Sequence, residues 1–217
     1  MIRFNSVSKI YDTNVFALRS LTTGINKGEF VFVTGSSGAG KSTLLKLLYG
    51  ELKPSSGNIS IHDKEVHSLS RSKLAYLRRQ MGIIFQDFKL LWDRTVFDNV
   101  CLPLHIWGGN KDAAAKAERI MTELNIWRYK DLYPRQVSGG EQQKIAICRA
   151  LIGEPWILIA DEPTGNLDPA SATEVFNIFN RIAKKGSTVI FATHNEHLMR
   201  LHNGRVMHLD KGKLVTA

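Results

Sequence analysis

The sequence has few cysteines and no long hydrophobic run, and both absences restrict what the chain can be. Its two cysteines, Cys101 and Cys148, among 217 residues do not have the spacing of a metal site or a redox pair. Small apolar residues in reducing surroundings explain them most simply. No apolar stretch approaches the roughly 20 residues that a bilayer-spanning helix needs, and the N-terminus lacks the apolar core of a signal peptide. We therefore expect a cytosolic protein, unless a partner holds it at a membrane.

Acidic residues are scarce relative to basic ones. There are 29 Lys and Arg against 20 Asp and Glu, which gives a formal net charge of +9. This excess fits binding to polyphosphate, to an anionic membrane face or to nucleic acid, while a solvated basic surface is the commonest explanation. The length and the 43% apolar content are those of a globular chain with one domain, or one domain with a subdomain.

Strand-like segments alternate with helical ones in both halves of the chain. An apolar, β-branched run at 29–34 predicts a buried strand, and leucines at helical spacing from Ser42 to Tyr49 predict a helix that Gly50 ends. Further strands are expected at 57–61, 82–85, 156–160 and 187–193, with a crossover helix at about 169–184. From Thr95 to about Gly153 the pattern is mainly helical, which indicates an inserted helical subdomain in an α/β fold.

A glycine-rich segment lies between the first predicted buried strand and its helix. It consists of Gly35, Ser36, Ser37, Gly38, Ala39, Gly40, Lys41, Ser42 and Thr43. Its glycines let backbone N–H groups point inward around phosphate oxygens, and the helix N-terminus favours negative charge there. Lys41 can reach the β- and γ-phosphates, and the Ser42 hydroxyl can ligate Mg²⁺. The segment predicts a nucleotide-binding site.

Side chains suited to hydrolysis follow the other predicted strands. Asp161 ends an apolar strand at the sheet edge where ligands bind in open α/β folds, and it can hold Mg²⁺ directly or through water. Glu162 is the candidate general base or water-positioning residue. His194 could hydrogen-bond the γ-phosphate, and Gln86 could sense both Mg²⁺ and the γ-phosphate. Tyr11 could stack on adenine, with a packed surface tyrosine as the alternative.

A second helix start also has the features of a phosphate site. Ser138, Gly139 and Gly140 open a predicted helix, where serine is a good N-cap and exposed N–H groups beside glycines favour an anion. An ordinary capped helix is the alternative. Because the chain already has one phosphate loop, however, the second start implies a second molecule. Asp168 and the three residues before it could lie across the same seam between two copies.

The full set of motifs resembles the ATP-binding-cassette ATPases in order and approximate spacing. GSSGAGKST is similar to their Walker A motif, Gln86 to the Q-loop, VSGGEQQ to the signature, ILIADE to Walker B, GNLD to the D-loop and His194 to the switch histidine. The resemblance implies a P-loop NTPase with a RecA-like parallel-sheet core and an antiparallel β subdomain in residues 1–87 and 154–217, and a helical subdomain in residues 88–153. It also implies a homodimer that encloses ATP and Mg²⁺, with Lys41 of one copy and Ser138 and Gly140 of the other at each site.

Glu141 departs mildly from the family pattern, because glutamine is frequent at that position. Asn195 also departs, since it follows His194 where acidic residues are common.

A narrower resemblance is to the FtsE branch of this family, the bacterial cell-division ATPases. QDFKLL, followed after one residue by DRTVFDNV, carries it. It implies a peripheral location on the cytoplasmic face of the inner membrane at the division site. It also implies an integral membrane partner resembling FtsX and an indirect link to peptidoglycan hydrolases.

The partner would dock near Leu90, Leu91 and Trp92, where an apolar groove would suit a helix; internal packing of these residues is the alternative. LIADEPTGNLD is shared with lipoprotein-releasing and macrolide-export ATPases, so an exporter motor is the alternative function. No nucleic acid partner is expected, because the chain lacks the long heptad insertion of chromosome-maintenance ATPases.

Overall fold

A computed structural model describes residues 1–12, 15–108 and 112–216. Its strands are β1 (Ile2–Ile10), β2 (Phe16–Ile25), β3 (Phe30–Thr34), β4 (Ser56–Ile61), β5 (Lys64–Glu65), β6 (Met81–Ile84), β7 (Ile157–Asp161), β8 (Thr188–Ala192), β9 (Arg205–Asp210) and β10 (Lys213–Thr216). Its helices are α1 (Lys41–Leu48), α2 (Arg71–Arg79), α3 (Val96–Ile106), α4 (Ala113–Glu123), α5 (Gly139–Leu151), α6 (Pro169–Lys184) and α7 (Glu196–Arg200). Short 3-10 turns lie at Val66–Ser68, Trp127–Tyr129 and Pro134–Gln136.

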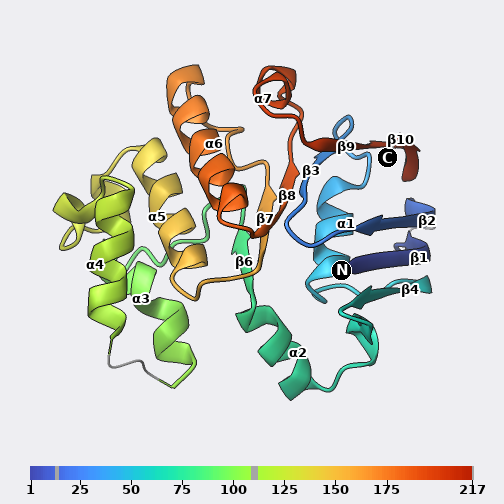
Figure 1. The fold of residues 1–217 in the computed structure, drawn as a ribbon, viewed down its shortest axis with the longest axis horizontal. Coiled ribbons are helices and arrows are strands. Elements are labelled where there is room, and N and C mark those ends of the chain that lie inside the picture. Colours follow the sequence, from blue (N-terminus) through green and yellow to red (C-terminus); the bar gives the residue numbers. More distant parts are fainter. Residues whose placement is uncertain (13–14, 109–111, 217) are drawn as a thin grey trace.

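The larger sheet has the strand order β10-β9-β3-β8-β7-β6 (Figure 1). Its neighbouring strands are parallel except for β10, which pairs antiparallel with β9. The central strands β3, β7 and β8 are buried along nearly their whole length. Burial on both faces explains why these strands read as continuous apolar runs rather than as alternating ones.

Alternate residues of β3 serve two different hydrophobic cores. Phe30 and Phe32 pack in the core on the side of the helices α3 to α6, and Val31 and Val33 pack in the core that contains α1. Successive side chains of a strand point to opposite faces of the sheet, so one strand joins both cores. The loop that follows β3 is therefore attached to the most buried part of the molecule.

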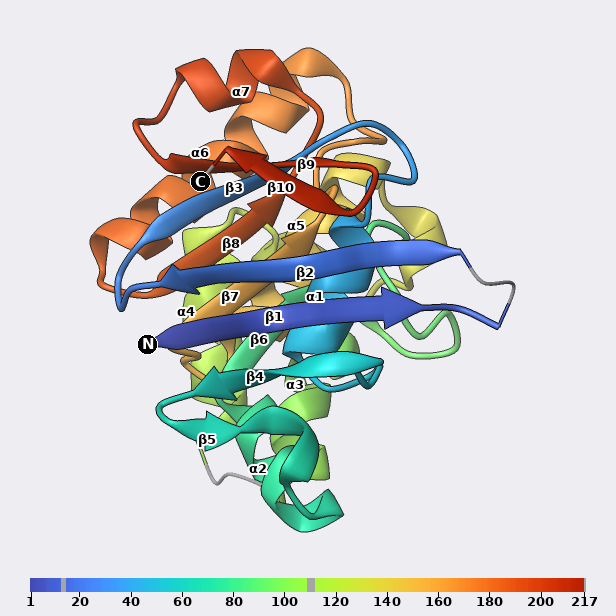
Figure 2. The same cartoon turned by 90° about the vertical axis from the view of Figure 1, so that its right-hand side faces the viewer.

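A second, antiparallel sheet covers the far side of α1. Its strand order is β2-β1-β4-β5, and Figure 2 shows β2, β1 and β4 side by side. Its inward residues, among them Ile2, Phe4 and Ile59, share one core with the leucines of α1. The expected α/β class, with a parallel-sheet core and an antiparallel β subdomain, is confirmed.

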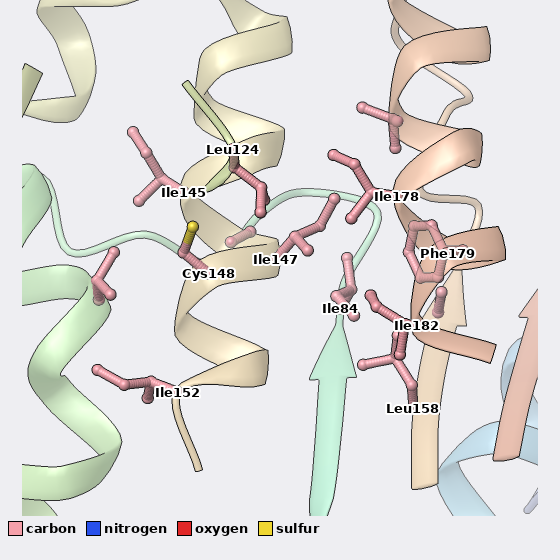
Figure 3. Close-up of a cluster of buried hydrophobic side chains, with 14 of the residues drawn as sticks. Ile84, Leu124, Ile145, Ile147, Cys148, Ile152, Leu158, Ile178, Phe179 and Ile182 are labelled. Carbon is pink, nitrogen blue, oxygen red and sulfur yellow. The ribbon is translucent and has the colours of Figure 1, made fainter. Parts of the chain in front are cut away.

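The helical segment packs directly on the sheet. One continuous hydrophobic cluster runs from α3 and α4 through α5 to α6 and the strands. In Figure 3, Ile147 of α5 lies close to Ile178 of α6 and to Ile84 of β6. Because the helices share this core, residues 88–153 extend the sheet's core; the subdomain boundaries stay a prediction.

Both cysteines are buried in this helical core. Burial raises the pKa of the Cys101 thiol to about 11, and burial also raises the pKa of Cys148. Thiols with raised pKa values are poor nucleophiles. The cysteines therefore pack as small apolar side chains. Within the described residues, no helix is long and apolar enough to cross a bilayer.

Candidate functional site

The carboxyl ends of the parallel strands meet at one edge of the larger sheet. The glycine-rich segment follows β3, Gln86 follows β6, Asp161 ends β7 and His194 follows β8. A cleft of about 710 Å³ opens at this edge. It is lined by Tyr11, Val15, Phe16, Ala17, Ser36, Ser37, Gly38, Gly40, Lys41, Ser42, Thr43, Gln86, Glu162 and His194. The topology thus gathers most of the sequence-predicted site residues in one place.

Two glycines of the loop lie where a side chain would be strained. Gly35 has φ 139° and Gly40 has φ 110°, a backbone region that other residues rarely adopt. A Cβ at Gly35 would collide with the Leu209 carbonyl, and one at Gly40 with the Ala17 carbonyl. Gly40 is also the N-cap of α1, and no side chain of the described residues caps this helix start. The first N–H groups of α1 are therefore open to an anion.

Lys41 is folded back over this loop. Only 8% of the residue is exposed, and its ammonium donates hydrogen bonds to the carbonyls of Gly35 at 2.8 Å and Ser36 at 3.3 Å. Its Nζ also lies 3.5 Å from Oε1 of Glu162, which is equally buried. A buried lysine needs such partners, because burying an unpaired charge is costly. The ammonium thus sits between the phosphate loop and the candidate base.

Glu162 joins Lys41 to His194. Its second oxygen, Oε2, lies 3.0 Å from Nδ1 of His194, whose side chain is 70% exposed. An ionised carboxylate can only accept hydrogen bonds, so Nδ1 carries the proton in this pair. Glu162 therefore holds one oxygen toward a buried cation and the other toward a histidine at the mouth of the cleft. This arrangement could orient a water molecule for attack.

Asp161 lies beneath the cleft, next to Ser42. Burial raises the pKa of its carboxyl, against the lowering effect of a hydrogen bond from Ser42. Its Oδ1 is buried and has no hydrogen-bond partner among the described residues. Carboxylate, hydroxyl and amide oxygens are the ligands that Mg²⁺ prefers, usually with waters and substrate phosphates completing the shell. Asp161, Ser42 and Gln86 therefore fit a magnesium ion that binds with the nucleotide.

Among the described residues, no group of three or more His, Cys, Asp or Glu side chains is placed to hold a metal ion by itself.

Tyr11 lies at the rim of the cleft, with Val15 and Phe16 beside it among the lining residues. Its hydroxyl is 3.2 Å from Oγ1 of Thr43, and 39% of the residue is exposed. Sequence reasoning missed Val15 and Phe16, which are 58% and 40% exposed. The available signal was an aliphatic and an aromatic residue next to each other where β2 begins, and the Arg19 guanidinium lies over the Phe16 ring at 4.3 Å. The rim is the apolar part of the cleft, as a nucleobase would need.

Ser138 lies outside this cleft. It caps α5, and its backbone N–H and hydroxyl both contact Oε2 of Glu141 at 2.8 Å. Ser138, Gly140 and Glu141 line a separate small pocket of about 180 Å³ with Lys144, Ser171, Glu174 and Val175. No described atom lies within 4 Å of a Cβ built on Gly139. One chain alone therefore does not bring the predicted second phosphate site to the first.

Asp168 is already engaged as a helix cap. Its carboxylate caps α6 and accepts hydrogen bonds from the backbone N–H groups of Ala170 at 3.0 Å and Ser171 at 3.1 Å. The side-chain hydrogen bond from Ser171 leads the interactions that lower the pKa of Asp168. Asp168 is not among the residues that line the cleft.

The expected docking residues do not share one environment, and Leu90 shows the internal packing that was the alternative to docking. Leu90 is 4% exposed and belongs to the helical core, whereas Leu91 is 38% and Trp92 44% exposed. The buried Asn99 of α3 explains this geometry. Its amide bonds both the N–H and the carbonyl of Leu91, at 2.7 and 2.9 Å.

Arg149 of α5 holds the preceding part of the same loop. Its guanidinium donates to the carbonyls of Phe88 and Lys89, both at 2.6 Å. Sequence reasoning missed Asn99 and Arg149. The available signal was a polar residue on the apolar face of each helix.

A strand, a glycine loop that leads into an uncapped helix, and carboxylates at the neighbouring strand ends together define a P-loop nucleoside triphosphatase. The sequence profile of the ABC transporter family matches residues 18–165. The chain belongs to this family, and it is one of its ATPases.

Similar proteins span nearly the whole chain. The cell division ATP-binding protein FtsE of Bacillus subtilis is 40% identical over 99% of this chain and 95% of its own length. The protein of the same name in Escherichia coli is 42% identical over 99% of this chain and 97% of its own length. The FtsE of Mycobacterium tuberculosis is 39% identical over 99% of this chain and 94% of its own length.

A solved structure of the cassette MJ0796 superposes with a TM-score of 0.91 at 31% identity, covering 99% of this chain and 97% of that one. It is a dimer in a post-hydrolysis state, bound to ADP and Pi.

Proposed function

We propose that this chain is the ATP-hydrolysing subunit of a membrane complex of the FtsE–FtsX type. It works as a homodimer that encloses ATP and Mg²⁺, and it is held peripherally on the cytoplasmic face of the bacterial inner membrane at the division site. ATP-driven closing and opening of the dimer controls peptidoglycan hydrolases through the membrane partner. Identity of 40–42% over almost the full length of cell-division ATP-binding proteins supports this role.

The shared ATP site rests on one structural observation. Lys41, Glu162 and His194 line one cleft, whereas Ser138 and Gly140 line another pocket. A second copy can bring its Ser138 and Gly140 to the first copy's cleft. The related cassette solved as a dimer with ADP and Pi supports such an arrangement.

Each cleft residue has a role that follows from its contacts. Lys41 exchanges its carbonyl partners and Glu162 for the β- and γ-phosphates, since charge-assisted bonds to phosphate are stronger than bonds to neutral carbonyls. Glu162 then polarises the attacking water as general base, and His194 steadies the water and the γ-phosphate. Gln86 would contact the ion and the γ-phosphate, and Tyr11 stacks on adenine. Asp168, which does not line the cleft, lies at the proposed dimer seam.

A bound Mg²⁺ would neutralise phosphate charge. Ser42 and Asp161, whose Oδ1 is buried without a partner among the described residues, would hold it with Gln86.

The membrane partner docks on Leu91 and Trp92. These side chains are exposed on a loop that Asn99 and Arg149 fix from two helices. A fixed loop presents an apolar surface without the entropic cost of ordering it on binding. Leu90 packs in the helical core and anchors the loop there.

Co-purification tests this role and separates it from the exporter alternative. The tagged chain is captured from detergent-solubilised membranes, and the bound membrane protein is identified by mass spectrometry. An FtsX-type protein is the expected result. Recovery of a lipoprotein-releasing or macrolide-export permease instead would assign the chain to an exporter.

A matched pair of variants tests the docking surface. Leu91→Asp should lose the membrane partner but retain nucleotide binding, because a charge in an apolar contact is costly. Leu201→Asp is the control, since Leu201 is 46% exposed on another part of the surface. Equal partner recovery with both variants would contradict docking at Leu91.

A further inference from the structure

The hydroxyl of Ser138 is already occupied by a carboxylate of its own chain. Oγ lies 2.8 Å from Oε2 of Glu141, and the Ser138 N–H reaches the same oxygen at 2.8 Å. In return, the Glu141 N–H donates to Ser138 Oγ at 3.4 Å. This is a capping box, which satisfies donors at the start of α5.

The number of protons on the two groups shows that this contact competes with a hydrogen bond from Ser138 to a phosphate. A serine hydroxyl has one proton, and an ionised carboxylate has none to donate, so the 2.8 Å contact uses the Ser138 proton. The fully ionised γ-phosphate is also only an acceptor. Ser138 can bond a partner's γ-phosphate through this proton only by releasing Glu141.

The pocket around Ser138 also lacks the excess positive charge that a phosphate would favour. Its lining contains the carboxylates of Glu141 and Glu174 and a single cation, Lys144. Lys144 Nζ is paired with Glu174 at 2.6 Å. The Glu141 carboxylate therefore remains as an uncompensated charge within the pocket, where it would repel an incoming phosphate.

Two neighbours outside the pocket moderate this charge. Nη2 of Arg128 lies 3.9 Å from Oε1 of Glu141, and the Tyr129 hydroxyl also bonds the carboxylate. Partial burial alone would raise the pKa of Glu141, but the bonds from Tyr129 and Ser138 and the Arg128 charge together lower it. Glu141 thus stays ionised at neutral pH.

We propose that Glu141 restrains ATP-driven dimer closure by competing with the partner's γ-phosphate for the Ser138 hydroxyl, and that Arg128 sets the strength of this restraint. The inference rests on the proposed shared ATP site. Glu141 is a positioning residue: it acts on the phosphate through Ser138 and through its charge. The restraint keeps nucleotide-bound monomers available until another contribution, such as partner docking, favours closure.

The variant Glu141→Gln tests the effect of Glu141 on dimer closure separately from its role in capping α5. Glutamine also completes a capping box, so Glu141→Gln keeps the start of α5 intact while it removes the charge and replaces the carboxylate that holds the Ser138 proton by a weaker, neutral amide acceptor. An acidic side chain in the first turn favours a helix, so the variant should be no more stable than its parent. A purely structural role for Glu141 therefore cannot produce a tighter dimer.

The experiment measures ATP-dependent dimerisation by analytical ultracentrifugation in a Glu162→Gln background, which slows hydrolysis. Glu141→Gln should lower the dimer dissociation constant about tenfold, the size of two partly screened like-charge contacts, one at each shared site. Arg128→Met should raise it by up to about fivefold, as expected for one exposed ion pair. Arg128→Met combined with Glu141→Gln should change the constant less than about twofold relative to Glu141→Gln alone, since Arg128 then has no charge to offset.

Two controls match the changes in net charge. Glu118→Gln removes an exposed carboxylate on α4, and Arg71→Met removes an exposed guanidinium on α2. Neither should move the dimer dissociation constant. Binding of a fluorescent ATP analogue to dilute monomers should be the same in all these variants, because none of the positions 71, 118, 128 and 141 lines the chain's own cleft.

The outcomes distinguish this inference from the proposal on which it rests. If the Glu162→Gln chain dimerises with ATP but Glu141→Gln shifts the constant no more than Glu118→Gln, the restraint is wrong and the shared site stands. If Arg128→Met has the same effect with and without Glu141, the offsetting role is wrong. If the background chain remains monomeric with ATP at every protein concentration, both the shared site and the restraint fail.

Discussion

The starts of α1 and α5 are both candidate phosphate sites, yet the chain treats them in opposite ways. At α1 the N-cap is Gly40, which has no side chain to offer, and the first N–H groups stay open. At α5 the N-cap is Ser138, and a complete capping box with Glu141 occupies the helix start. In the proposed dimer, the open start is ready for nucleotide in a single copy, whereas the capped start must first release Glu141. On this comparison, we infer that the start of α1 governs nucleotide binding and that the start of α5 governs closure of the proposed dimer.

Glu162→Gln should have the largest effect, because in the proposed dimer it arrests the chain while both helix starts face one nucleotide. Removing the general base should slow ATP hydrolysis by roughly a thousandfold and leave ATP binding intact. Phosphate release under saturating ATP measures the rate, and sedimentation measures the trapped dimer. Turnover close to that of the unmodified chain would remove Glu162 from the mechanism.

Ser138→Arg tests the capped start alone. The long side chain should fill the small pocket at α5 and weaken ATP-dependent dimerisation at least about a hundredfold, as a steric block at a contact centre does. Nucleotide affinity of the monomer should not change, because Ser138 does not line the cleft. Normal dimers in sedimentation experiments would contradict the shared site.

Lys41→Ala tests the open start. Losing the charge-assisted bonds to the β- and γ-phosphates should weaken ATP binding by roughly thirtyfold, the equivalent of about 2 kcal/mol. AMP, which lacks both phosphates, is the control ligand and should lose little affinity. Unchanged ATP affinity in equilibrium titrations would reject the assignment of Lys41.

Alanine substitutions at Gly40 and Gly139 should have the smallest effects, and they compare the stability of the two helix starts directly. Gly40→Ala should destabilise the chain by about 1–2 kcal/mol, because its φ of 110° is strained for alanine and the Cβ meets the Ala17 carbonyl. Gly139→Ala places its Cβ where no described atom lies within 4 Å, so its effect should stay below about 1 kcal/mol. Chemical denaturation measures both, and equal losses would contradict the described loop geometry.

Local patterns predicted the elements whose burial is regular, either along the whole strand or on one face of a helix. The continuous apolar runs of β3, β7 and β8 were visible because both faces of these strands are buried, and α6 begins and ends at the predicted residues. The phosphate loop was visible because its glycines, lysine and serine follow one another in the chain. In these cases, the residues that form the element are also the residues whose pattern predicts it.

The remaining elements depend on distant partners. The strand β9 was not predicted, because pairing with β3 rather than its own pattern defines it, as Val31 opposite Arg205 illustrates. The helix α2 was also missed; within the described structure it has no buried residue, and Arg78 ties it to the carbonyls of Tyr49 and Gly50.

The docking loop shows the same limit at a finer scale. Leu90 and Leu91 look alike in sequence, but Leu90 packs inside and Leu91 outside because Asn99 and Arg149 fix the backbone of the loop.

Strand β3 has its side chains in both cores, and this has a consequence for motion. Displacing the strand would expose Phe32 on one side and Val33 on the other, so the chain would lose apolar contacts from two directions at once. Strand β3 should therefore stay fixed relative to both cores. The amide hydrogens of Phe32 and Val33 should exchange with solvent only on global unfolding. Rearrangements that accompany the ATP cycle must therefore take place in the parts around it.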